Sequence, residues 1–157
     1  MATNCRFAFA THILSVLALH EAGSCSSGVL AGTVNTNPVV IRRLLLDLKD
    51  AGLIEAQRGP GGGARLSRAP QKITLAQIHR AVAGEIEAFG EHPNLPAQCC
   101  PVGRGIQSVL ERISRQACAA AMQEFERVSL ADVLADLASD NQSDNQNEAQ
   151  NEAVISH

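Results

Sequence analysis

Aromatic side chains are scarce in this chain of 157 residues, which contains four Phe and neither Trp nor Tyr. A hydrophobic core must therefore be built from Ala, Leu, Val and Ile. Over much of the chain these residues recur at helical spacing, which is typical of amphipathic helices. The length is sufficient for one domain with a proper core, or for a small domain with an added oligomerisation element. The sequence thus predicts a mainly α protein.

Signals for secretion and for membrane insertion are also missing. The apolar run that follows Arg6 is interrupted by His12 and His20, so it is too short to cross a bilayer, and nothing like a cleavage site follows it. We expect a cytoplasmic protein without membrane contact. Its five cysteines are then expected to be reduced thiols rather than a disulfide framework.

The sequence lacks the usual signatures of catalysis and metal binding. It has no His-x-x-x-His, no Cys-x-x-Cys and no nucleophile-elbow pattern. The glycine run from Gly59 to Gly63 is not followed by the Lys-Ser/Thr pair of a phosphate-binding loop. We therefore predict that the protein is not an enzyme, and that it has no metal site and no cofactor.

An amphipathic helix is predicted over residues 37–51. Asn37 can cap its first turn, and Pro38 occupies the helical position at which a missing N–H costs nothing. Gly52 provides the helix stop. The apolar residues fall at the spacing of one buried face, and they are Ile41, Leu44, Leu45 and Leu48.

This helix is flanked by elements that complete a known arrangement. A short helix is predicted over 26–34, with residues 35 and 36 as the turn between the two helices. After the helix, an apolar segment leads into a glycine-rich loop that begins with Arg58, and residues 64–67 can return as a second strand. The order of helix, turn, helix and wing, with the wing at 57–66, predicts a winged helix-turn-helix with a two-stranded wing.

The charge distribution agrees with DNA as a partner. Residues 1–80 contain nine Lys or Arg and four Asp or Glu, whereas residues 81–157 contain four and twelve. The basic half of the chain is thus the half with the helix and the wing, as expected for a surface that binds double-stranded DNA. The predicted DNA-binding residues are Asn37, Val39, Val40, Arg42, Arg43, Arg58, Gly61 and Gly62.

A long helix is predicted over about 104–128, with one broad apolar stripe. Such an element outside a winged domain favours a two-fold dimer contact, because helix-turn-helix proteins use dimers to bind paired half-sites. The predicted organisation is a DNA-binding domain at 1–84, a loop at 85–103 and a dimerisation region at 104–138. That region includes a short last helix at 130–137, and a disordered polar tail follows at 139–157.

Several of these segments together resemble the Rrf-two family of winged-helix transcription regulators, over about residues 4 to 137. The resemblance rests on Arg6-Phe7-Ala8, Leu17-Ala18-Leu19, Asn37-Pro38-Val39-Val40-Ile41-Arg42-Arg43, Ala51-Gly52-Leu53-Ile54, Arg58-Gly59-Pro60-Gly61-Gly62-Gly63 and Ile73-Thr74-Leu75. Cys100-Pro101-Val102-Gly103 resembles a subgroup without the three-cysteine cluster motif. The resemblance implies a homodimer that binds a two-fold operator, and we predict a repressor.

The signal that such a regulator would sense is less defined by the sequence. The resemblance implies a [2Fe-2S] cluster in many relatives, but the loop here has only the adjacent Cys99 and Cys100. A thiol switch is better supported, because Cys100 precedes a helix N-terminus, which lowers a thiol pKa. Cys99, or Cys25 or Cys5 of a second subunit, could form the disulfide with it. A small effector, an atypical cluster and a winged-helix protein-interaction module remain open as alternatives.

Overall fold

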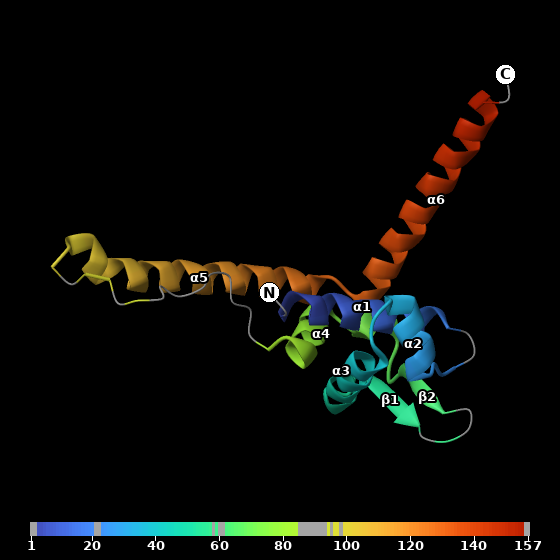
Figure 1. Cartoon of the computed structure of the whole chain (residues 1–157), viewed down its shortest axis with the longest axis horizontal. Coiled ribbons are helices and arrows are strands. Elements are labelled where there is room, and N and C mark those ends of the chain that lie inside the picture. The colour runs from blue at the N-terminus through green and yellow to red at the C-terminus, as the bar shows by residue number, and fades with distance from the viewer. Residues whose placement is uncertain are drawn as a thin grey trace.

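The computed structural model describes residues 3–20, 23–57, 59, 62–84, 94, 96–97 and 99–155, and within these ranges the side chains from residue 5 to residue 142. Helices dominate this part of the chain, so the mainly α prediction is confirmed (Figure 1). The elements in chain order are α1 (Thr3–Leu19), α2 (Ser27–Val34), α3 (Pro38–Asp50), β1 (Ile54–Gln57), β2 (Gly63–Leu66), the 3-10 helix η1 (Pro70–Lys72), α4 (Leu75–Val82), α5 (Pro101–Arg127) and α6 (Leu130–Ile155).

The core lies where α1 meets α2, α3 and α4. The largest fully buried side chains of α1 are Ile13 and Leu14, and α3 contributes Ile41, Leu44 and Leu48. Leu45, which the sequence places on the same buried face, is only half-buried. Because α1 is apolar on most of its surface, it can serve as the central helix against which the others pack.

Polar contacts fix how α1 sits against its neighbours. The Arg6 guanidinium forms an ion pair with Asp47 of α3, and Arg6 Nε donates to the Val82 carbonyl at the end of α4, at 2.8 Å. One side chain of α1 therefore joins three helices.

The hairpin of β1 and β2 is antiparallel, with Ile54 opposite Leu66 and Gln57 opposite Gly63. Cys25 extends it by two backbone hydrogen bonds with Ala64, at 2.9 and 2.8 Å. A Cβ atom on Gly63 would lie 2.6 Å from the Cys25 carbonyl oxygen. Gly63 is thus required for the close approach of the segment before α2 to the second strand.

The junction between α5 and α6 is attached to the winged domain by its backbone. The Leu75 N–H donates to the Val128 carbonyl at 2.9 Å, and the Leu130 N–H donates to the Ile73 carbonyl at 2.8 Å. The Leu130 side chain is fully buried in the core. From this junction α5 and α6 extend away from the domain in different directions (Figure 1).

Two helix boundaries differ from the sequence prediction. α5 begins at Pro101 rather than near residue 104, because a proline is well suited to the first helical position. α6 continues to Ile155, whereas the sequence predicted an end at 137 and a disordered tail after it. Residues 130–155 contain neither Gly nor Pro, so no strong helix breaker lies within this segment.

No helix of the described residues is both long enough and apolar enough to cross a membrane.

Candidate nucleic-acid interface

The start of α3 is exposed and capped as the sequence predicted. The Val39 N–H donates to Asn37 Oδ1 at 2.8 Å, and Pro38 occupies the first helical position. Asn35 adopts a left-handed conformation with φ of 53°, which turns the chain between α2 and α3. A side-chain cap of this kind contributes about 1 kcal/mol to helix stability. Asn37 therefore has a structural role, and its side-chain nitrogen is left to meet a ligand.

One exposed face of α3 carries four side chains, which we call the recognition face: Val39, Arg42, Arg43 and Leu46. Val39 and Leu46 are 61% and 60% exposed, although both are apolar. Arg42 and Arg43 are exposed, and neither forms an ion pair with any described residue. Two unpaired guanidinium groups between apolar side chains can meet phosphates, guanine edges and thymine methyl groups.

The structure adds Leu46 to the exposed residues that the sequence singles out on this helix, and it places the predicted contact Val40 at the edge of the core. Val40 is half-buried and packs against the core, so it contributes less to the exposed face than Val39 does. Leu46 could have been found by its position, because it falls outside the buried spacing of Ile41, Leu44 and Leu48. A leucine that the helix period turns to solvent is a candidate contact residue.

The wing is the second part of the candidate interface, and it lies at the same end of the domain as α3 (Figure 1). Arg65 on β2 forms an ion pair with Glu55 on β1 at 2.7 Å, so its charge is partly neutralised. The Gly62 N–H donates to the Gly59 carbonyl at 2.9 Å, and Gly59 has a φ of 105° that favours glycine. The predicted contacts Arg58 and Gly61 lie outside the described residues.

The three candidate redox cysteines occupy different environments. Cys99 and Cys100 are exposed, whereas Cys25 is buried with only 2% of its surface accessible. Backbone hydrogen bonds from Gly103 and Val102, at the start of α5, lower the pKa of the Cys100 thiol. Burial raises the pKa of Cys25. The structure therefore distinguishes an exposed thiol with a lowered pKa at a helix N-terminus from a buried core thiol with a raised pKa.

Among the described residues, no three His, Cys, Asp or Glu side chains are grouped so that they could hold a metal ion. Residues 85–93, which include His92, lie outside the described part of the chain. The residues that the structure describes do not fit a cluster.

A helix-turn-helix with an exposed second helix, followed by a glycine-tipped hairpin, defines a winged helix-turn-helix DNA-binding protein. Comparison with known proteins identifies the group within this class. Residues 3–136 match the model of the Rrf2 family, described as iron-dependent transcriptional regulators, and the chain belongs to that family. It is therefore a transcription regulator and not an enzyme.

Individual relatives agree with this assignment. The chain is 40% identical over 131 residues to YwnA of Bacillus subtilis, provisionally described as an HTH-type transcriptional regulator, with 83% of this chain and 96% of YwnA covered. It is 31% identical to the HTH-type transcriptional regulator IscR of Cereibacter sphaeroides, over 60% of this chain and 59% of IscR.

Solved structures show the same fold. A crystal structure provisionally described as that of a DNA-binding protein is 36% identical, with a TM-score of 0.65, and covers 82% of this chain and 98% of its own. A transcriptional regulator from Lactobacillus plantarum, also a provisional description, has a TM-score of 0.74 at 21% identity and covers 92% of this chain and 97% of its own. The second likeness supports the fold alone.

Proposed function

We propose that two copies of this chain pair through α5 and repress transcription by occupying a two-fold DNA operator. The observation that carries the proposal is the state of α5 itself. This helix has 27 residues, and none of them is buried in the single chain. At 1.5 Å per residue it is about 40 Å long, which exceeds what the small winged domain can cover.

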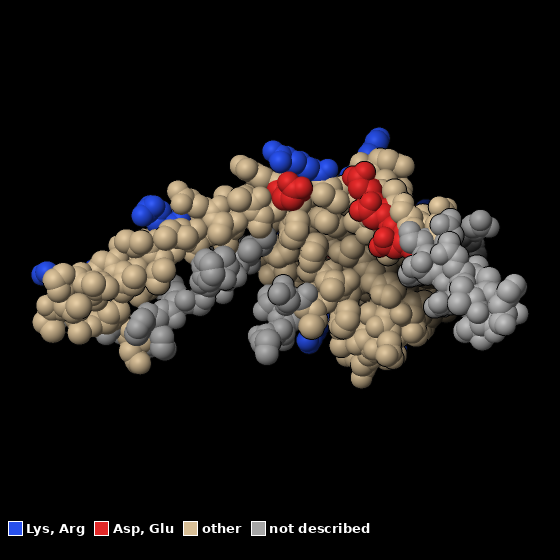
Figure 2. Space-filling view, turned by 90° about the horizontal axis from the view of Figure 1, so that it is seen from above, with Lys and Arg blue, Asp and Glu red and all other residues tan. Residues whose placement is uncertain are grey.

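The exposed surface of α5 is suited to a second copy of the same helix. Val102, Val109, Leu110 and Ile113 are between 41% and 66% exposed. With Ile106 and Ala117 they follow a helical spacing of three and four residues, which places them on one side. Much of the α5 surface in Figure 2 carries no charge. An apolar stripe of this kind on a regulator is stabilised by pairing with an equivalent stripe.

Pairing through α5 would give the DNA-binding domains a two-fold relation. The C-terminal end of α5 is attached to the winged domain, so two paired helices would hold two recognition faces at a defined separation. Two half-sites on one duplex require such an arrangement. A repressor acts by excluding the transcription machinery from the operator that it occupies.

A charged residue within the apolar stripe tests the dimer and the DNA-binding mode together. Ile113→Glu places a carboxylate in the proposed contact, where an unpaired buried charge costs about 3–5 kcal/mol. We expect a monomer by analytical ultracentrifugation, and operator binding weakened by on the order of 100-fold or more. The matched control is Ser108→Glu, which adds the same charge on the opposite side of α5. If Ile113→Glu remains dimeric, α5 is not the dimer contact.

The operator is to be identified by selection from random duplexes. Repression is then measured by transcription in vitro from a promoter that contains the selected site. Repression is expected to fall as the salt concentration rises, because phosphate contacts release counterions. Failure to select any duplex would favour the alternative of a protein-interaction module.

Cysteine oxidation is the signal that the structure supports best. Cys100 is exposed and has a lowered pKa, so it is the attacking thiol in our proposal. Its partner is Cys99, or Cys5 of the second copy, since both are exposed and Cys25 is buried. Peroxide accepts two electrons and two protons from the two thiols, which form a disulfide, and peroxide is reduced to water.

The thiol proposal is tested by operator binding before and after mild peroxide and again after reduction. Reversible loss that is absent in Cys100→Ser supports it. Cys118→Ser removes a half-buried thiol within α5, and this variant should respond to peroxide like the unmodified protein. Binding that is indifferent to peroxide contradicts the switch and directs attention to a small ligand.

A further inference from the structure

A pocket lies beside α4 on the surface of the winged domain. It has a volume of about 370 Å³, within the usual range for small-molecule sites, and it is open to solvent. Its lining comes from the turn between α3 and β1, the chain after β2, and α4, and consists of Ala51, Leu53, Arg68, Gln77, Arg80 and Ala81. Among the residues that the structure describes, two arginines and no acidic residue line it, and the other lining residues are apolar except for Gln77.

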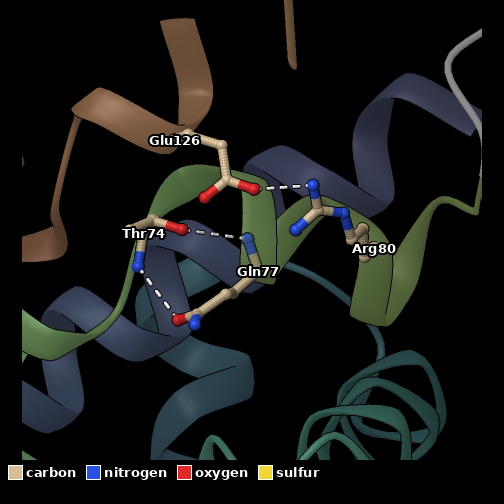
Figure 3. A network of polar contacts seen from close by, with 4 residues as sticks. All are labelled: Thr74, Gln77, Arg80 and Glu126. Carbon is tan, nitrogen blue, oxygen red and sulfur yellow. Dashed lines mark hydrogen bonds and ion pairs between the residues drawn. The ribbon is translucent and has the colours of Figure 1, made fainter. Parts of the chain in front are cut away.

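Neither arginine is committed to a strong partner. Arg80 forms an ion pair with Glu126 of α5 at 2.6 Å, but the two side chains are 57% and 47% exposed (Figure 3). An exposed pair of this kind contributes little to stability, so it can be exchanged for another carboxylate. Arg68 donates through Nη2 to Gln77 Oε1 at 3.1 Å, while its buried Nε has no hydrogen-bond partner among the described residues.

Gln77, which lines the pocket between the two arginines in sequence, is itself held in a fixed position. Its side-chain oxygen accepts from the Thr74 N–H at 3.2 Å, and its own N–H donates to Thr74 Oγ1 at 3.3 Å (Figure 3). This capping box anchors the first turn of α4, and Arg80 lies one turn further along the same helix. Arg68 and Arg80 line the same pocket as this amide, and a guanidinium can hold a carboxylate bidentately.

We infer that this pocket, which we call the anion pocket, binds a small organic acid with two or more carboxylates. One carboxylate replaces Glu126 on Arg80, the other pairs with Arg68, and the carbon chain lies against Leu53 and the two alanines. Binding then releases the contact between α4 and α5 that Arg80 and Glu126 form. The effect of this release on operator affinity rests on the proposed function, whereas binding of the acid does not.

The experiment is calorimetric titration of the full-length protein without DNA. Succinate and citrate are the probes, sulfate is the inorganic anion and succinamide is the neutral analogue, all at an ionic strength held constant with sodium chloride. Saturable binding of succinate or citrate that neither sulfate nor succinamide reproduces supports the site. Equal binding of sulfate overturns the assignment to an organic acid, and no saturable binding of any probe overturns the pocket.

Two variants separate a binding role from a structural one. Arg80→Gln and Glu126→Gln both remove the same ion pair, so a merely structural role would affect both in the same direction. We expect Arg80→Gln to weaken succinate binding by about tenfold or more, and Glu126→Gln to strengthen it by about two- to fivefold because the competing carboxylate is gone. Weaker binding in both variants contradicts the inference.

Arg65→Gln is the matched control for loss of an arginine. Arg65 is similarly exposed and similarly paired, with Glu55 in the wing, but it does not line the pocket. Its succinate affinity should equal that of the unmodified protein. An equal loss in Arg65→Gln and Arg80→Gln would show that net charge alone is responsible. Because the titration contains no DNA, its failure leaves the proposed regulator intact.

Discussion

The basic residues of α3 differ in whether their positions allow them to contact DNA. Arg42 and Arg43 belong to the recognition face near the start of α3, whereas Lys49 lies in the last turn. We expect Arg42→Ala and Arg43→Ala each to weaken operator binding by about 1–3 kcal/mol, with a smaller salt dependence where the lost contact is to phosphate. Lys49→Ala should leave affinity nearly unchanged. Fluorescence anisotropy at several salt concentrations measures the operator affinity and its salt dependence. An equal loss of affinity in Lys49→Ala would refute the proposal that the start of α3 contacts DNA.

His79 is a buried titratable side chain that the proposed function does not use. Its ring contacts both Phe7 and Phe125, with ring centroids 5.3 and 5.9 Å away, and its Nδ1 has no partner among the described residues. Burial lowers its pKa below the ordinary 6.5, and the charge of Arg80 acts in the same direction, while a hydrogen bond with the Gly84 backbone opposes them.

The lowered pKa of His79 predicts that stability falls in weak acid. The unfolded chain, with an ordinary pKa, binds more protons than the folded chain below about pH 6.5, so the free energy of unfolding decreases as the pH falls through that range. Urea titrations at about pH 7.5 and about pH 5.5 should show this decrease. His79→Leu should reduce it, whereas replacement of the exposed His12 by Gln should not. An unchanged pH dependence in His79→Leu would show that another group is responsible.

At the scale of a single element, the stability of the wing hairpin depends on one glycine. In Gly63→Ala the new methyl group would lie 2.6 Å from the Cys25 carbonyl oxygen, so the strand must move away from the segment before α2. We expect a loss of about 1–3 kcal/mol in the free energy of unfolding. Gly32→Ala is the control, because nothing lies within 4 Å of the added atom in the middle of α2. It should be neutral or should stabilise by up to about 1 kcal/mol. Urea denaturation measures the free energy of unfolding of both variants. Equal changes in Gly63→Ala and Gly32→Ala would disprove the steric argument.

The elements of the winged domain were predictable because each has a local signal. Asn37 and Pro38 mark the start of α3, Thr74 caps α4 in a capping box, and Gly52 with φ of 69° ends the helix before the hairpin. The length of α6 differs from the sequence prediction, because a polar segment with few apolar residues to bury predicts disorder. Helix propensity and the absence of breakers are the only local signals there.

Less of the candidate site was available from the sequence. Arg42 and Arg43 were predictable from helical spacing, but the burial of Cys25 depends on its backbone pairing with Ala64, which is distant in the chain. The anion pocket was not visible at all. Its arginines and Glu126 come from separate elements, and only the packing of α4 against α5 brings Arg80 and Glu126 together. Contacts between distant elements leave no periodic pattern in a sequence.

At the scale of the whole molecule, the end of α5 is connected to the winged domain in three ways. Phe125 stacks on Phe7 of α1 with centroids 5.1 Å apart, Glu126 pairs with Arg80 of α4, and Val128 accepts a backbone hydrogen bond from Leu75. The other end of α5 carries Cys100. A signal at either the thiol or the anion pocket would therefore act on the same helix, which is the one proposed to set the separation of the two recognition faces.

The acidic C-terminal segment is expected to weaken the nonspecific binding of the whole molecule to DNA. Residues 139–157 contain four Asp or Glu and no Lys or Arg, so their removal changes the formal net charge of the chain from -3 to +1. The family match ends at residue 136, and among the described side chains of α6 only Leu130, at its start, is buried, so truncation after residue 138 should preserve the fold. At low salt the truncated protein should bind random duplexes about threefold or more tightly, because repulsion between the segment and the phosphates is lost. The difference should shrink as salt screens the charges. Replacement of the four acidic residues by Asn and Gln in the full-length chain should reproduce the effect, and a gain that persists at high salt would show that the segment blocks the DNA surface sterically.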